Sequence, residues 1–189
     1  HRRRPHPHRC RREGRRRGRR PLRFGGARLL ARSAGEGGGV LSSWIINAAA
    51  DLGFRAQSTA SPGVAQRTGA TTYYIEIVPV AVHELGGKLP MLALTPGIGD
   101  IDIVMASEFM EAGRAIAAGF VTPDRTFLIT STNRFYVMNE KIVMGDGRYD
   151  QRRLSDAIKK NTQSSIMLDM DALAKANRTM INAVMLGVL

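Results

Sequence analysis

A glycine-rich turn is the first feature of this sequence that could do chemistry, and it stands directly before an apolar pattern of helical spacing. The turn consists of Gly35, Glu36, Gly37, Gly38 and Gly39. Glycines at the start of a helix allow a tight turn and leave backbone N–H groups that bind a phosphate or a carboxylate. They equally allow a neighbouring backbone to pack closely. The pattern therefore predicts either an anion site or a packing turn.

A bound dinucleotide is a weaker interpretation of the same turn. In dinucleotide-binding folds an acidic side chain at the end of the second strand binds the ribose. The sequence at that position is Gln57-Ser58-Thr59, which contains no acid. The turn is therefore not a dinucleotide fingerprint.

The second candidate is a polar loop over residues 58–69, which stands before a strand-like segment. Its last residues are Arg67, Thr68 and Gly69. A guanidinium group can bind a carboxylate or phosphate through two hydrogen bonds, and loops often carry functional residues. A solvated surface arginine is the alternative. We favour a substrate-binding or interface role for these three residues.

Two further groups favour structural roles. His83 has Glu84 beside it but no nucleophile that the sequence identifies, which indicates a solvated loop. Asp100 and Asp102 could hold a metal or transfer protons, but their place at the start of an apolar run favours a turn and strand start. The sequence therefore predicts no metal site on this chain and identifies no catalytic residue.

The triplet Gly-Asp-Gly at residues 145–147 resembles the start of a thiamine-diphosphate motif. Such a motif ends in a pair of asparagines. Asn177 lies near the required distance, but Arg178 follows it where the second asparagine belongs. A turn before the next helix is the favoured interpretation.

Apolar periodicity supplies the elements that must position these residues. We predict helices over residues 40–52, 108–118, 150–161, 169–176 and from 181 onward. We predict strands over residues 54–57, 70–78, 91–94, 101–106, 126–130 and 165–168. Strands that alternate with helices indicate an α/β, Rossmann-like fold with a mainly parallel sheet and helices on both faces.

The first strand of such a fold should precede the glycine turn. The segment at that place, residues 25–34, contains Arg28 and Arg32, which are poor residues for a buried central strand. We therefore expect the first strand to be damaged or missing.

The positive charge of the chain is concentrated before this segment. The 189 residues carry a formal net charge of +12, but residues 1–32 hold 14 arginines against one acid, Glu13, and residues 33–189 have a net charge of −1. We interpret residues 1–32 as a disordered tail that is not native, produced by a reading-frame change upstream of about Gly35. The alternatives are an organelle-targeting peptide and an RNA-binding arm.

Cysteine content and hydropathy exclude several classes of protein. Cys10 is the one cysteine, so this chain cannot hold a disulfide framework or a cysteine-ligated iron–sulfur cluster. No long uncharged apolar run is present, so we expect no membrane partner and a cytoplasmic location.

The body of the chain resembles the gamma domain of the 2-oxoacid:acceptor oxidoreductases, in particular the beta subunit of indolepyruvate:ferredoxin oxidoreductase. The similar segments are residues 35–41, 57–71, 102–107, 144–149 and 182–187, of which the Gln-Arg-Thr-Gly-Ala-Thr run at 66–71 is the most specific. The resemblance spans residues 35–189. The chain is therefore expected to consist of the arginine-rich tail over residues 1–32 and a gamma-type domain over residues 33–189. The resemblance implies that this domain is incomplete at its C-terminus.

The resemblance also implies a function. A complex of this kind oxidatively decarboxylates an aryl pyruvate or another 2-oxoacid to an acyl-CoA and passes electrons to ferredoxin. Thiamine diphosphate, Mg²⁺ and iron–sulfur clusters belong to a partner subunit, CoA is a co-substrate, and this chain alone is inactive. By extension, the glycine turn and the loop that holds Arg67 face CoA or the subunit interface.

Two other functions remain as alternatives. One is a Rossmann-like, nucleotide-binding oxidoreductase that works alone. The other is nucleic-acid binding through the arginine tail, which we do not favour because the body itself has no excess of basic residues.

Overall fold

The computed structural model describes residues 26–33, 37–62, 70–87, 89–133 and 150–189. These residues form a six-stranded sheet in the order β2-β3-β1-β4-β5-β6. The strands are β1 (Ala27–Ser33), β2 (Phe54–Ser61), β3 (Thr71–Ala81), β4 (Ile103–Ala106), β5 (Phe127–Ser131) and β6 (Ser164–Leu168). Strands β1, β4, β5 and β6 pair in parallel, whereas β3 runs antiparallel to both of its neighbours.

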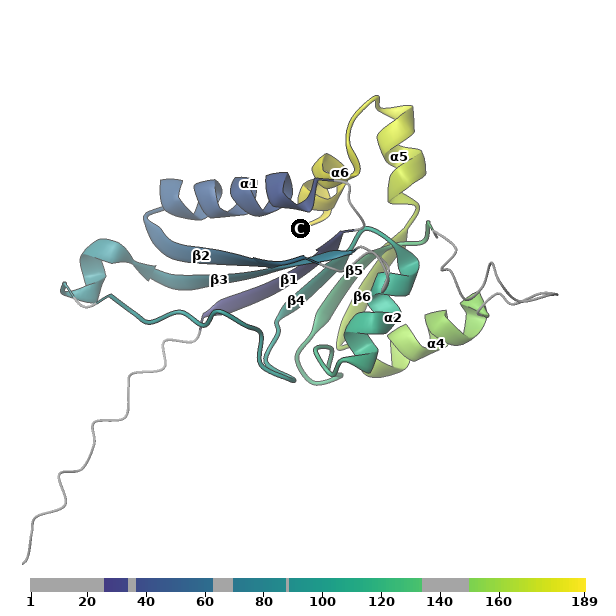
Figure 1. The fold of residues 1–189 in the computed structure, drawn as a ribbon, viewed down its shortest axis with the longest axis horizontal. Coiled ribbons are helices and arrows are strands. Elements are labelled where there is room, and N and C mark those ends of the chain that lie inside the picture. Colours follow the sequence, from purple (N-terminus) through teal and green to yellow (C-terminus); the bar gives the residue numbers. More distant parts are fainter. Residues whose placement is uncertain (1–25, 34–36, 63–69, 88, 134–149) are drawn as a thin grey trace, which may run out of the picture.

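Helices cover both faces of the sheet (Figure 1). They are α1 (Gly38–Asp51), α2 (Phe109–Ala117), α4 (Gln151–Asn161), α5 (Met170–Ala176) and α6 (Ile181–Val188), with a short 3-10 helix, η2 (Val82–Leu85). Helices α1, α5 and α6 share one apolar core with the sheet, and α2 and α4 share a second core on the opposite face. The predicted α/β, Rossmann-like class with a mainly parallel sheet is therefore confirmed. No helix among the described residues is long and apolar enough to cross a membrane.

Local sequence explains where the helices begin and end. Gly53 follows α1 with φ 76°, and Gly119 follows α2 with φ 75°, a backbone conformation that glycine adopts without strain. Asp150 and Asp169 cap α4 and α5, because each carboxylate accepts a hydrogen bond from a backbone N–H of the first turn. The observed helices thus begin and end within about two residues of the predicted bounds.

The first strand is intact, which corrects the expectation that it is damaged or missing. Strand β1 lies in the middle of the sheet, between β3 and β4. Its arginines are tolerated because each one meets a carboxylate: Arg28 Nε lies 3.2 Å from Glu76 Oε1 on β3, and Arg32 Nε lies 2.8 Å from Glu111 Oε2 on α2. The intervening Leu30 is fully buried.

The division expected after residue 32 falls inside β1, whose seven residues pair with β3 through the whole of Ala27–Ser33. The fold therefore includes residues 26–33. Residues 1–25, to which the rest of the tail prediction refers, lie outside the described residues.

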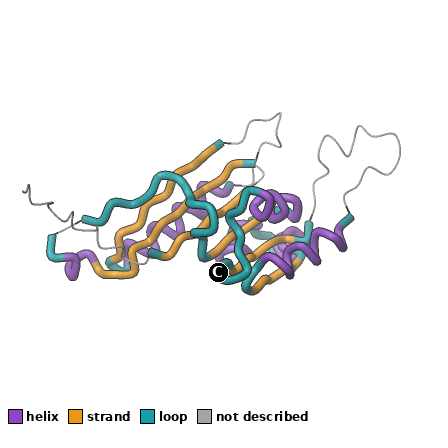
Figure 2. Tube along the Cα trace, turned by 90° about the horizontal axis from the view of Figure 1, so that it is seen from below, coloured by secondary structure: helices purple, strands orange, loops and turns teal. Residues whose placement is uncertain are grey.

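The strand predicted over residues 91–94 is also wrong. An irregular segment over residues 89–102, with a turn at residues 98–99, crosses the sheet face opposite α1, beneath β3 and β1 (Figures 1 and 2), and it joins no ladder. Strands β1 and β3 each have two neighbours already, so their backbone groups are paired and cannot accept another strand. The apolar run alone does not show whether the segment pairs with a strand or lies across the sheet.

Candidate functional site

The carboxyl edge of the parallel strands is the candidate site. Helices α1, α2 and α5 begin at this edge, after β1, β4 and β6. The chain leaves β1 for the face that carries α1, and it leaves β4 for the face that carries α2. In open α/β sheets, ligands bind where neighbouring strands send their helices to opposite faces. Here that place lies between the ends of β1 and β4.

The described part of the glycine turn packs tightly against three other elements. Gly37 has φ 78°, and a Cβ placed there lies 2.8 Å from Nδ2 of Asn182 on α6. A Cβ on Gly38 lies 2.5 Å from the ring of Tyr73 on β3 and 2.8 Å from Cβ of Ser33. All three distances are shorter than a Cβ contact allows, so a side chain at either glycine would force its neighbours to move. Of the two interpretations left open by the sequence, close packing accounts for these two glycines.

Gly39 differs from its neighbours, because a Cβ there meets Tyr73 Oη at an ordinary 3.6 Å. Packing therefore does not require a glycine at this position. Gly35 lies outside the described residues, as do Arg67, Thr68 and Gly69. The strands on either side of that loop are described: Ser61 pairs with Thr72, and Thr71 pairs with Ser33 at the end of β1.

Two buried serine hydroxyls lie at the switch between β1 and β4. Ser33 is 2% exposed and Ser107 is fully buried, and neither hydroxyl has a hydrogen-bond partner among the described residues. Their backbones are adjacent, since Ser107 N–H donates to Arg32 O at 3.1 Å. Buried hydroxyls normally find a partner, so these two groups are a polar feature of the edge that no other described residue satisfies.

A charged cluster joins the end of β1 to α2 beside these serines. Glu111 is 1% exposed and accepts a hydrogen bond from Arg32 Nε at 2.8 Å. Its other carboxylate oxygen accepts from Arg114, one turn further along α2. A carboxylate so deeply buried needs both cations, because an unpaired buried charge is strongly unfavourable. The cluster fixes α2 against β1 and leaves no free carboxylate for catalysis at this position.

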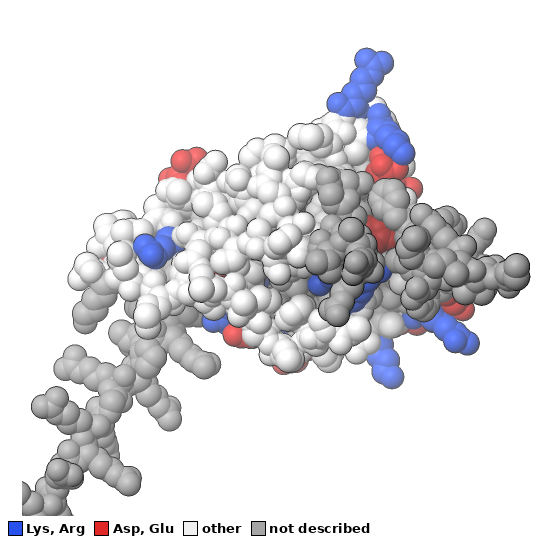
Figure 3. Space-filling model, in the orientation of Figure 1, with Lys and Arg blue, Asp and Glu red and all other residues white. Residues whose placement is uncertain are grey.

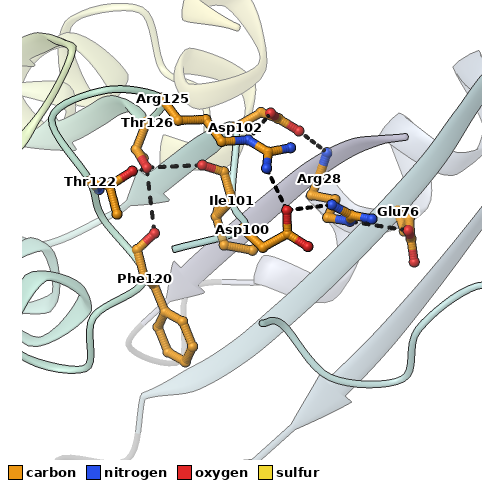
Figure 4. A network of polar contacts seen from close by, with 9 residues as sticks. All are labelled: Arg28, Glu76, Asp100, Ile101, Asp102, Phe120, Thr122, Arg125 and Thr126. Carbon is orange, nitrogen blue, oxygen red and sulfur yellow. Dashed lines mark hydrogen bonds and ion pairs between the residues drawn. The ribbon is translucent and has the colours of Figure 1, made fainter. Parts of the chain in front are cut away.

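A second ionic network lies at the opposite end of β1 (Figure 4). Arg28 Nη1 lies 2.6 Å from Asp100 Oδ1, and the backbone N–H of Arg28 donates to Asp102 Oδ2 at 2.7 Å. Arg125 Nε donates to Asp102 Oδ1 at 2.7 Å and also pairs with Asp100. Both carboxylates are thus used to anchor the start of β4. The structural interpretation of Asp100 and Asp102 agrees with these contacts.

The network holds its arginines in the charged form. Hydrogen bonding to Asp102 raises the pKa of Arg125 further above its usual high range. Burial lowers the pKa of Arg28, but the hydrogen bond to Glu76 and the charge of Asp100 outweigh it and leave the pKa raised. Burial and the negative charge of Glu76 raise the pKa of Tyr74 to about 12. None of these groups is suited to exchange protons near neutral pH.

The other sequence candidates take structural positions. The His83 side chain is 81% exposed and lies 3.8 Å from Glu84, so it is solvated as expected, although it lies in the 3-10 helix η2 rather than in a loop. Asn177 ends α5, where its side chain donates to Leu173 O at 2.9 Å. Residues 145–147 lie outside the described residues. The described ranges contain no group of three or more His, Cys, Asp or Glu that could hold a metal ion.

The charge distribution of the described residues gives no basic surface on the face seen in Figure 3. Lysine and arginine side chains lie mainly toward the ends of that view, with acidic side chains near several of them. The middle of the view, over α1 and the strands beneath it, is uncharged. The described residues on this face therefore form no basic stripe of the kind that binds a nucleic acid backbone.

Fold and edge together define a Rossmann-like α/β protein with its candidate site at the switch between β1 and β4. A sequence model of the family described as pyruvate ferredoxin/flavodoxin oxidoreductase matches residues 29–189. The chain belongs to this family. The match begins inside β1, which agrees with the inclusion of that strand in the fold.

One solved structure is similar in fold. It is the pyruvate oxidoreductase subunit PORC from Thermotoga maritima, with a TM-score of 0.53 and 17% sequence identity, over 86% of this chain and 73% of that one. Among curated proteins, none matches this chain significantly.

Sequence reasoning missed three residues of the edge: Ser33, Tyr73 and Ser107. A signal existed for Ser107, since it is a polar residue directly after a fully apolar strand at a place where α/β folds bind ligands. No comparable signal existed for Tyr73, because its contact with Gly38 depends on β3 lying beside β1.

Proposed function

We propose that this chain is the gamma-type subunit of a 2-oxoacid:ferredoxin oxidoreductase, acting in the cytoplasm on indolepyruvate or another aryl pyruvate. The reaction is oxidative decarboxylation to an acyl-CoA, with electrons delivered to ferredoxin. The observation that carries the proposal is the family match over residues 29–189, which spans every element from β1 to α6. The aryl pyruvate preference rests on the sequence resemblance alone.

The main catalytic cofactors belong to a partner subunit in this proposal. Thiamine diphosphate with Mg²⁺ supplies the decarboxylation chemistry, and iron–sulfur clusters carry the electrons. A cluster held by cysteines needs several thiolates, and this sequence contains one cysteine, Cys10. Among the described residues, no group of three or more His, Cys, Asp or Glu could hold a metal ion, and the carboxylates of Asp100 and Asp102 are engaged by arginines. In this proposal the chain acts through binding and positioning.

This chain contributes the carboxyl edge of its sheet. The glycine turn, including Gly35 and Gly37–Gly39, and the loop with Arg67, Thr68 and Gly69 face CoA or the partner subunit. Two described features support this assignment: the register of β3 brings the start of that strand beside Ser33, and the buried hydroxyls of Ser33 and Ser107 lie at the same edge. Both loops therefore start from one place in the fold.

A stand-alone dinucleotide-binding enzyme is disfavoured by the order of strands. In that fold the second strand lies beside the first and presents an acid to the ribose. Here the antiparallel β3 separates β1 from β2. The final residues of β2, Ala60 and Ser61, carry no acid either.

Reconstitution tests the proposal. The full chain is combined with the thiamine-diphosphate, iron–sulfur subunit from the same source, and CoA-dependent reduction of ferredoxin is measured with indolepyruvate, phenylpyruvate and pyruvate. We expect activity only with both subunits, and a higher kcat/KM for the two aryl substrates. Activity confined to pyruvate would overturn the aryl preference, and activity unaffected by omission of this chain would overturn its role as a subunit.

Calorimetric titration distinguishes a subunit of a CoA-dependent oxidoreductase from a stand-alone nucleotide-binding oxidoreductase. CoA should bind to the reconstituted complex, and NAD(P)H should give no measurable heat with the full chain. Tight NAD(P)H binding to the chain alone would favour the stand-alone enzyme.

A further inference from the structure

Residues 89–99, here called the apolar segment, present large apolar side chains to solvent. Leu89 is 61% exposed, Met91 94%, Leu94 69% and Ile98 80%. The segment covers the face of β2 and β3 that lies opposite α1. Four such side chains within one short segment are unusual in a folded chain, and clusters of this kind mark interaction surfaces.

Hydrogen bonds to its backbone hold the apolar segment in this conformation. Glu76 Oε2 accepts from Ala93 N–H at 2.6 Å, while Gln57 Nε2 donates to Ala93 O at 3.3 Å. Thr59 Oγ1 donates to Leu94 O at 2.7 Å. The polar side chains of β2 and β3 thus bind the inner side of the segment. Its apolar side chains are presented outward on a fixed backbone, which lowers the ordering cost of binding.

Charge identifies the kind of partner that fits this surface. The eleven residues from Leu89 to Gly99 contain no charged side chain. Asp100, which follows, is neutralised by Arg28 and Arg125. A polyanion would find no cation on the segment, and a charged protein surface would lose its hydration without compensation. The segment is complementary to an uncharged, apolar protein surface, like the centre of a stable subunit interface.

We propose that the apolar segment is the docking surface for the cofactor-carrying subunit of the oxidoreductase. This inference rests on the proposed function, because it assigns a surface of this chain to the partner that the function requires. Leu94 and Met91 are the anchors: Leu94 combines high exposure with a hydrogen-bonded backbone carbonyl, and Met91, two residues before the bonded Ala93, is 94% exposed. The competing occupant is a second copy of this chain.

The test measures the affinity of the full chain for the purified thiamine-diphosphate, iron–sulfur subunit from the same source. The variants are Leu94→Asp and Met91→Asp. The matched control is Leu52→Asp: Leu52 has the same 69% exposure but follows α1, which packs on the other face of the sheet. We expect each segment variant to raise Kd by about 30-fold or more, as for an interface hot spot, and the control to leave Kd within about twofold.

Each outcome decides the inference. If the native chain binds and Leu94→Asp binds equally well, the assignment of the apolar segment as the docking surface is wrong, while the proposed function stands. If the native chain does not bind the subunit at all, both fail. If sedimentation shows that the native chain self-associates, and Leu94→Asp abolishes self-association but not subunit binding, the second copy is the occupant.

A second measurement does not depend on substitution. Hydrogen exchange of the native chain, alone and in the complex, should show slower exchange of the amides in residues 89–99 on binding, with no change around Leu52. Unchanged exchange in the apolar segment would overturn the proposal. Thermal unfolding of all three variants within a few degrees of the native chain shows that the affinity changes do not come from misfolding.

Discussion

Arg28 on β1 and Glu76 on β3 lie directly opposite one another in the register of the two strands, and Arg28 Nε donates to Glu76 Oε1 at 3.2 Å. The two side chains are 22% and 8% exposed. Glu76 also accepts from Ala93 N–H, so one carboxylate joins β1, β3 and the apolar segment. This pair allows an arginine in the central strand of the sheet.

Arg28→Met should lower the free energy of unfolding by about 3 kcal/mol, because it leaves the largely buried Glu76 carboxylate without its cation. Glu76→Gln should cost less, about 1 kcal/mol, since Arg28 keeps Asp100 at 2.6 Å. Urea denaturation of both single variants and the double variant measures the coupling. The pair is not coupled if the double variant loses the full sum of the two single losses.

Gly38→Ala and Gly39→Ala should act in opposite directions although the residues are neighbours. The new methyl group at Gly38 meets the Tyr73 ring at 2.5 Å and Ser33 Cβ at 2.8 Å, so overpacking should cost about 1–3 kcal/mol. At Gly39 the nearest atom is 3.6 Å away, and alanine should stabilise α1 by about 0.5–1 kcal/mol. Thermal unfolding compares the two, and equal shifts would contradict the packing.

Thr126→Val should destabilise the fold by about 1–3 kcal/mol. The buried hydroxyl of Thr126 donates to Ile101 O at 2.9 Å and accepts from Thr122 N–H at 3.0 Å, so valine leaves both backbone groups unpaired (Figure 4). The exposed Thr132 provides the control, and Thr132→Val should change stability by less than about 0.5 kcal/mol. Similar losses in both variants would show that the hydroxyl network contributes nothing.

Stability should fall as pH rises from about 10 to about 12 through the titration of Tyr74. Burial and the charge of Glu76 raise the pKa of Tyr74 from 10.0 to about 12 in the folded chain, so the unfolded chain loses this proton first. Deprotonation then favours unfolding across that interval, and below pH 10 the contribution is fully present. The difference in unfolding free energy between the native chain and Tyr74→Phe should shrink across this interval. A constant difference would mean that Tyr74 titrates normally.

The sequence predicted the fold class and most elements because these depend on local patterns. The apolar spacing of α2 and the run that becomes β4 are visible without the structure, and both occur as expected. The state of β1 was not predictable, because the carboxylates that neutralise its arginines, Glu76 and Glu111, come from distant elements.

The candidate site was predictable only in part. Glycines at the start of α1 are visible in the sequence, but the reason for Gly38 is the ring of Tyr73, which depends on strand order. The segment at 91–94 has the composition of a buried strand, but it lies across the sheet, where side chains of β2 and β3 bind its backbone, and Met91 and Leu94 are exposed. Pairing between distant segments is the information that a single sequence lacks.

The central position of β1 has a consequence for how the chain folds as it is synthesised. Strand β1 emerges before the other described strands, and its neighbours β3 and β4 come later in the chain, whereas β2 and β3 are adjacent and can form a hairpin early. Until then β1 has two unpaired edges, which invite pairing with other chains. Arg28 and Arg32 interrupt its apolar residues with charge, as gatekeeper residues do in aggregation-prone strands. The side chains that bind β1 to its neighbours in the folded protein therefore also protect the nascent strand before those neighbours exist.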